Sequence, residues 1–114
     1  MEKRRSSKEV FSMCPYDFEI ENIKNQLIRK YHPIDIILFG SCARGRVTRR
    51  SDIDICMILE TNDKRKIVRD ILFEVEYEVD LDVVVYTPQE WQTNKDDRAT
   101  FASIIKRTGV SLIG

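Results

Sequence analysis

Residues 34–59 read IDIILFGSCARGRVTRRSDIDICMIL and carry the clearest structural signals in the chain. It contains two apolar runs, residues 34–39 and residues 52–59, on either side of a polar loop rich in arginine. The first run ends abruptly at Gly40, which is typical of a buried strand that leads into a turn. We therefore predict two strands connected by this loop.

Two acidic residues stand at the start of the second apolar run. Asp52 and Asp54 are two positions apart, so in a strand they share one face at about 6.5 Å, because each residue advances about 3.3 Å. Carboxylates among apolar neighbours repel each other and are poorly solvated, so a cation between them stabilises the pair. Oxygen ligands suit Mg²⁺, which shares its remaining sites with water and phosphates. Taken alone, the pair can also be interpreted as two acids on an edge strand whose side chains point to solvent.

A third carboxylate is expected on a neighbouring strand. Asp82 comes directly before the apolar run at residues 83–85, just as Asp54 comes directly before Ile55. Asp80 is the alternative, because it lies on the same strand face as Asp82. Three acids would hold two metal ions about 3.5–4 Å apart, bound to the attacking and leaving oxygens of a phosphoryl transfer. Asp82 could also accept the proton of the attacking hydroxyl.

The loop before these acids has the features of a phosphate site. Gly40 can adopt backbone angles that other residues avoid, and Ser41 is expected to open a short helix with free N–H groups that face an anion. Arg44 follows one helical turn later and can reach the same anion. Gly45 permits a close approach of the backbone to the anion or a sharp change of chain direction. A lone Gly-Ser after a strand is usually an ordinary turn, but here it lies directly upstream of the paired acids.

Hydrophobic spacing and capping signals predict the remaining elements. The pattern from Thr87 to Glu90, with Pro88 between them, is a capping box that begins a helix. We place Leu72 on the core face of the helix after residue 63, and Phe101 and Ile104 on the core face of the last helix. In chain order we predict helix 17–31, strand 34–39, strand 52–59, a helix after residue 63 with Ile67, Ile71, Leu72 and Val75 inward, strand 80–86, a helix from residue 88, helix 97–107 with Phe101, Ile104 and Ile105 inward, and a short edge strand at 110–113.

Length and composition indicate one small globular domain. The 114 residues are 42% hydrophobic and 33% charged, which suits a folded chain of this size. We predict a loose N-terminal arm, or alternatively a short extra helix, over residues 1–13 and a domain over residues 14–114. The fold class expected is α/β (α+β), with a mixed sheet of three to four strands and helices packed mainly on one face.

Charge and cysteine usage exclude several classes of protein. Lys+Arg and Asp+Glu are balanced at 19 each, which argues against extended nucleic-acid binding. No apolar run approaches the roughly 20 residues of a membrane span, and the N-terminus lacks the apolar part of a secretory signal. The three cysteines, Cys14, Cys42 and Cys56, lack CxxC spacing, so we expect reduced thiols in a cytoplasmic protein.

The combined pattern resembles the DNA polymerase β-like nucleotidyltransferase superfamily, and within it the minimal nucleotidyltransferases (MNT proteins) of bacteria and archaea. The family pattern is Gly-Ser, then Arg-Gly, then Ser-Asp-x-Asp, with a later Asp on a strand. The chain is similar to it over about residues 18–113, including the stretch after Asp82 and the closing residues 109–112. Cys42 departs from the basic or larger polar residue of many relatives, and the acid-rich residues 74–78 make the choice between Asp80 and Asp82 less direct. The residues that carry the resemblance are Gly40, Ser41, Arg44, Gly45, Ser51, Asp52, Asp54 and Asp82.

The resemblance implies an Mg²⁺-dependent enzyme that transfers a nucleoside monophosphate, with AMP from ATP as the expected donor group, and releases pyrophosphate. It implies Asp52, Asp54 and Asp82 as catalytic ligands of two Mg²⁺ ions. Gly40, Ser41, Arg44, Gly45 and Ser51 would then bind the nucleotide.

The acceptor is expected to be a protein, or else a partner chain or a second copy completes the site, because the chain carries only the catalytic core. Stand-alone MNT proteins act as antitoxins beside HEPN toxins, so the resemblance implies a HEPN-type partner that is adenylylated on a tyrosine. The alternatives are transfer to a small hydroxylated molecule of the aminoglycoside type by a dimer, and a non-catalytic module that neutralises its partner by contact.

Overall fold

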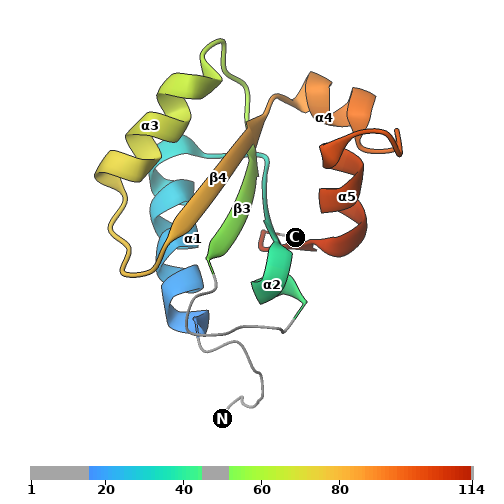
Figure 1. Ribbon diagram of the computed structural model, residues 1–114. Helices are drawn as coiled ribbons and strands as arrows, with labels where there is room; N and C mark the ends of the chain where they lie inside the picture. The colour runs from blue at the N-terminus through green and yellow to red at the C-terminus, as the bar shows by residue number, and fades with distance from the viewer. Residues whose placement is uncertain (1–15, 45–51, 114) are drawn as a thin grey trace.

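Four strands form one mixed sheet, in the order β4 (Leu81–Tyr86), β3 (Ile53–Ile58), β2 (Asp35–Phe39) and β5 (Val110–Ser111) (Figure 1). The computed structural model describes residues 16–44 and 52–113. The two central strands, β2 and β3, are antiparallel, and β5 is antiparallel to β2, whereas β3 and β4 are parallel. The predicted α+β class with a mixed sheet is confirmed, and each strand is one to two residues shorter than expected.

The first helix, α1 (Asp17–Tyr31), has the bounds that its apolar spacing predicts. Acidic residues in its first turn and basic residues in its last turn complement the helix dipole. His32 ends the helix in the left-handed conformation (φ 48°), and its N–H donates to the carbonyl of Ile28 at 3.1 Å. The single histidine of the chain therefore caps this helix and is exposed.

Side-chain caps set the starts of three later helices. In α3 (Lys64–Glu74) the N–H of Lys66 donates to Asp63, and α4 (Pro88–Asn94) has the predicted capping box between Thr87 and Glu90. The last helix, α5 (Phe101–Thr108), begins four residues later than predicted. The reason is that Thr100 accepts the N–H of Ser103, while residues 97–100 form a turn before the helix.

Hydrophobic cores lie on both faces of the sheet. The two longest helices, α1 and α3, cover the face with the larger core, and α4 and α5 pack on the other face (Figure 1). Along β3 the alternation is clear, because Ile55 belongs to the larger core and Cys56 to the smaller one. The second core is small and consists of Ile37, Cys56, Ile58 and Ile105, with Phe39, Tyr86 and Trp91 against it.

Three residues that we placed in the core are partly exposed. Leu72 keeps 42% of its surface exposed, because Ile71 fills the space between α3 and the sheet. In α5, Phe101 and Ile104 are 50% and 45% exposed, and the buried residues of this helix are Ala102, Ser103 and Ile105. Small side chains at two of these positions let α5 lie close to the sheet.

No helix in residues 16–44 or 52–113 is long and apolar enough to cross a membrane.

Candidate active site

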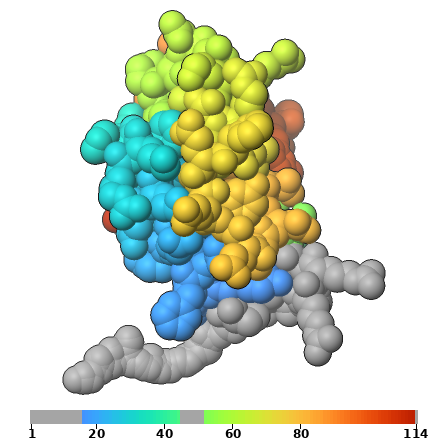
Figure 2. All heavy atoms as spheres, turned by 90° about the vertical axis from the view of Figure 1, so that its left-hand side faces the viewer, coloured from blue at the N-terminus to red at the C-terminus, as the bar shows by residue number. Residues whose placement is uncertain are grey.

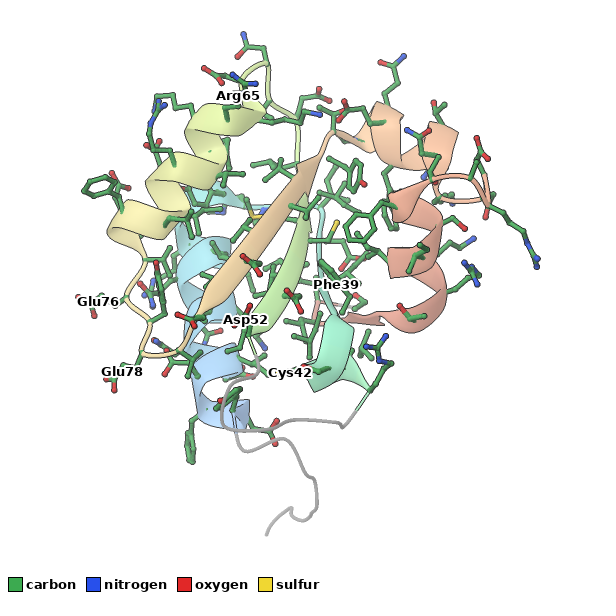
Figure 3. The ribbon with its side chains drawn as sticks, in the orientation of Figure 1. Phe39, Cys42, Asp52, Arg65, Glu76 and Glu78 are labelled. Carbon is green, nitrogen blue, oxygen red and sulfur yellow. The ribbon has the colours of Figure 1, made fainter. Side chains whose placement is uncertain are left out.

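Three chain segments meet at the edge of the sheet that is formed by the C-terminal end of β2 and the N-terminal ends of β3 and β4. Because β2 runs antiparallel to β3, its C-terminal end lies beside the start of β3, and parallel pairing places the start of β4 there too. Phe39 at the end of β2 lies opposite Asp54, and Asp54 lies opposite Asp82. Figure 3 shows Asp52 at the start of β3, close to Phe39 and to the short helix α2 (Gly40–Ala43) that follows β2.

The carboxylates of this edge lie on the sheet face that carries the smaller core. Ile53 and Ile55 of β3 are fully buried on the α1–α3 face, so Asp54 between them faces the opposite side. Asp82 follows the same alternation on β4, after the buried Leu81. The α1–α3 face thus anchors both strands, while the acids project from the other face.

Gly40 is required here for two independent reasons. Its φ of +75° lies in the left-handed region that favours glycine. A β-carbon at this position would also overlap Oδ2 of Asp54 and come within 3.1 Å of its Cγ. The predicted backbone freedom of Gly40 is therefore confirmed, and the structure adds that Gly40 makes the space in which Asp54 lies.

The environment of Asp54 disfavours its negative charge. Partial burial, the charges of Asp82 and Asp52 and a hydrogen bond with Asp82 together raise the pKa of Asp54 to about 6, and the nearby Arg44 opposes this shift. The side chains of Asp54 and Asp82 therefore lie within hydrogen-bonding distance, and a proton or another cation between them relieves their repulsion.

Asp82, and not Asp80, is the carboxylate that contacts Asp54. The backbone carbonyl of Asp80 accepts the N–H of Ile53 at 2.8 Å, which fixes the start of β3 against β4. The carboxylate of Asp80 is absent from the groups that shift the pKa of Asp54. Of the two alternatives that the sequence left open, the geometry favours Asp82.

The predicted short helix after β2 is present as α2, and Ser41 lies in its first turn. Arg44 is the residue after the last turn of this helix, and its N–H donates to the carbonyl of Gly40 at 3.2 Å. The side chain of Arg44 is exposed, and its positive charge acts on Asp54. The other two nucleotide-binding residues that we predicted, Gly45 and Ser51, lie outside the described residues.

Cys42 has a positioning role that sequence reasoning missed. Its side chain is 5% exposed, and its Sγ lies 3.6 Å from the carbonyl oxygen of Asp52, to which the thiol donates. Cys42 therefore packs into the core and ties α2 to the start of β3, rather than facing a phosphate. The signal was available, because Cys42 and Ala43 are the only apolar residues in the loop sequence from 40 to 46.

The donor set fits a hard divalent cation. Asp54 and Asp82 supply carboxylate oxygens that already meet and repel, and Asp52 adds a third negative charge nearby. Within the described ranges no three His, Cys, Asp or Glu side chains are already arranged as a complete metal site. The pair is thus in place, and the three-ligand set that includes Asp52 stays a prediction.

Comparison with known families agrees with this geometry. Residues 20–105 match the family described as "Nucleotidyltransferase domain", a match that runs from α1 into α5. No curated protein is significantly similar in sequence. The matched region covers about three quarters of the chain and contains Gly40, Arg44 and all the acids at the edge of the sheet. The chain therefore belongs to the nucleotidyltransferase domain family, whose activity is the transfer of a nucleoside monophosphate.

Proposed function

We propose that this protein is an Mg²⁺-dependent adenylyltransferase of the minimal nucleotidyltransferase type, which moves AMP from ATP onto a hydroxyl of a HEPN-type protein partner and so acts as its antitoxin. The observation that carries the proposal is the contact between Asp54 and Asp82 beside Gly40. Carboxylates held this close without a cation are unfavourable, and a metal-dependent phosphoryl transfer uses that arrangement.

Each residue of the site has a role in the proposed reaction. Asp54 and Asp82, with Asp52, would hold divalent cations, which supply charge neutralisation on the triphosphate. The N–H groups at the start of α2 and the Ser41 hydroxyl would bind phosphate oxygens, and Arg44 would add a positive charge. Gly40 keeps this loop close enough to Asp54 for both to reach one triphosphate.

The proposed transfer is a single displacement at the α-phosphorus. The acceptor hydroxyl oxygen forms a bond to the α-phosphorus while the bond to the α,β-bridging oxygen breaks, and pyrophosphate leaves. Asp82 accepts the hydroxyl proton. Because no covalent bond to the protein is needed, positioning and charge neutralisation account for the catalysis.

The test is a transfer assay with ATP labelled at the α-phosphate, Mg²⁺ and a HEPN-type protein encoded beside this chain. We expect label on a tyrosine of the partner, one pyrophosphate released for each AMP transferred, and loss of both in Asp54→Asn and Asp82→Asn. Asp80→Asn is the matched control, because Asp80 carries the same group two residues away without contacting Asp54, and it should retain most of the activity.

The same assay separates the alternatives. Neutralisation of the partner without label, unchanged in Asp54→Asn, would mean that the protein acts by contact alone. Label on aminoglycoside-type molecules and on no protein would assign a small-molecule acceptor instead.

A further inference from the structure

The outer side of α3 carries an apolar surface that the fold leaves uncovered. Phe73 is 86% exposed and Leu72 is 42% exposed, and beside them runs a groove of about 560 Å³. Val85 in the groove belongs to β4, whose outer edge pairs with no other strand in the described part of the chain. We call this surface the α3 patch; it consists of Lys64, Arg65, Val68, Arg69, Leu72, Phe73 and Val85.

The charged residues of α3 are arranged unfavourably for the helix dipole, with basic residues at the N-terminus and an acidic residue at the C-terminus. Its first turn carries Lys64, Arg65 and Lys66 and no acid, and its last turn ends at Glu74 with no base. Each such charge interacts unfavourably with the helix dipole. By contrast, α1 begins with acids and ends with bases. Of the three basic residues in the first turn of α3, Arg65 is the one without an ion-pair partner among residues 16–44 and 52–113.

Two of the basic side chains are available for an outside partner. Lys64 and Lys66 form ion pairs with Glu90 and Asp70, at 2.7 and 2.8 Å. Arg65 and Arg69 have no carboxylate partner among residues 16–44 and 52–113, and both line the groove.

Acidic side chains lie beyond the C-terminus of α3, where Glu76 and Glu78 line a second groove that shares Leu72 with the α3 patch. Figure 3 shows Arg65 at one end of α3 and Glu76 and Glu78 at the other, all directed outward. Figure 2 shows the same face filled by α3 beside α1, with the segment after α3 continuing along it. The surface is thus basic at one end, apolar in the middle and acidic at the other end.

From this pattern we infer that the α3 patch binds a second copy of this chain across a twofold axis, with the two α3 helices antiparallel. An axis through the middle of α3, between Asp70 and Ile71, places Phe73 of one copy opposite Val68 of the other. The same axis places Arg65 opposite Glu76. A surface with this order of charges is complementary to itself only in the antiparallel arrangement.

The helix dipoles support the same arrangement. In an antiparallel pair the positive N-terminus of one α3, with its arginines, lies beside the negative C-terminus of the other. The contact also leaves the candidate active site open, because α3 covers the sheet face opposite to Asp54 and Asp82. The inference does not depend on the proposed reaction.

The apolar part is tested by sedimentation equilibrium of the full chain from about 1 to 200 μM. We expect wild type to be a dimer of twice 13.4 kDa. Phe73→Asp should weaken dimerisation at least tenfold. Phe18→Asp is the matched control, because Phe18 is an aromatic residue on α1 that is 93% exposed and lies outside the patch. It should stay dimeric, and circular dichroism should show that both variants are folded.

The charged ends allow a sharper test. One double variant, Arg65→Glu with Arg69→Glu, makes both ends acidic, and the other, Glu74→Lys with Glu76→Lys, makes both ends basic. Each variant alone should be monomeric, and an equimolar mixture of the two should form a heterodimer.

Three results would overturn the inference: a monomeric wild type at 200 μM, a Phe73→Asp variant that dimerises as well as wild type, or a mixture of the two charge variants that stays monomeric. The first would assign the α3 patch to a different partner or to none. The other two would move the dimer contact elsewhere.

Discussion

At the residue scale, the space around Asp54 is set by its neighbours on two other segments. Gly40 leaves room on one side, and Asp82 supplies a second carboxylate on the other. A protein selected for stability alone would not place two acids within hydrogen-bonding distance at a half-buried position. The pair therefore lowers the stability of the fold, which is a pattern typical of functional sites.

Replacement of Asp54 by Asn should stabilise the fold at neutral pH. The pKa of Asp54 is raised from 3.8 to about 6, so the folded state favours the protonated form. The stability linked to this group is fully present below about pH 3.8 and is lost as the pH rises through about 6. At pH 7.5 we expect Asp54→Asn to be about 1–2 kcal/mol more stable than wild type, a figure already reduced for solvent screening.

Urea unfolding of both proteins at pH 4 and pH 7.5 measures this difference. The advantage of Asp54→Asn should nearly vanish at pH 4, where wild-type Asp54 is largely protonated. Equal stabilities at both pH values would show that Asp54 and Asp82 are not electrostatically coupled.

Gly40→Ala should damage both stability and the site. The left-handed backbone costs a non-glycine residue about 1–2 kcal/mol, and the added methyl group overlaps the Asp54 carboxylate. We expect a loss of about 2–4 kcal/mol in the free energy of unfolding together with a large loss of nucleotide transfer. Ser41→Ala, next in the chain, should lower stability by well under half as much, and thermal unfolding compares the two. A Gly40→Ala protein with wild-type activity would contradict the required close approach.

At the element scale, the orientation of α3 can be tested by two adjacent residues. Ile71 is fully buried and Leu72 is 42% exposed. Ile71→Ala should therefore cost about 2–5 kcal/mol in the free energy of unfolding, and Leu72→Ala less than about 1.5 kcal/mol. Denaturant unfolding of the two variants checks this, and similar losses would mean that α3 is rotated from the position described.

Elements with strong local signals could be predicted from the sequence. The apolar spacing of α1, its C-terminal Pro33 and the capping box of α4 are determined by residues within a few positions of each other. The start of α5 was placed too early because Asp97 and Thr100 are both plausible caps, and only Thr100 accepts the N–H three residues later.

Contacts between distant segments could not be predicted in the same way. Asp80 and Asp82 share a strand face, and the choice between them depends on the register of β4 against β3. That register follows from packing across the sheet, where Leu81 and Ile53 enter the same core. Likewise, the apolar pair Cys42 and Ala43 indicates that this turn packs inward, but the hydrogen bond of Cys42 to Asp52 depends on how α2 lies against β3.

Across the whole molecule, the two faces of the sheet carry different features. The α1–α3 face holds the larger core and, on its outside, the α3 patch. The other face carries the acids at its edge beside α2. In the proposed dimer, this division would leave the carboxylates accessible to a nucleotide and an acceptor.

We propose that the end of β2 and the starts of β3 and β4 together form a site for a divalent cation. Mn²⁺ is a suitable probe, because it accepts the same oxygen ligands as Mg²⁺ and its electron paramagnetic resonance signal reports the free ion. The measurement is a titration of Mn²⁺ into wild type, Asp54→Asn, Asp82→Asn and the control Asp80→Asn, each with a non-hydrolysable ATP analogue. We expect wild type and Asp80→Asn to bind the ion similarly, and Asp54→Asn and Asp82→Asn to bind it at least tenfold more weakly. Equal Mn²⁺ affinity in all four proteins would contradict the proposal.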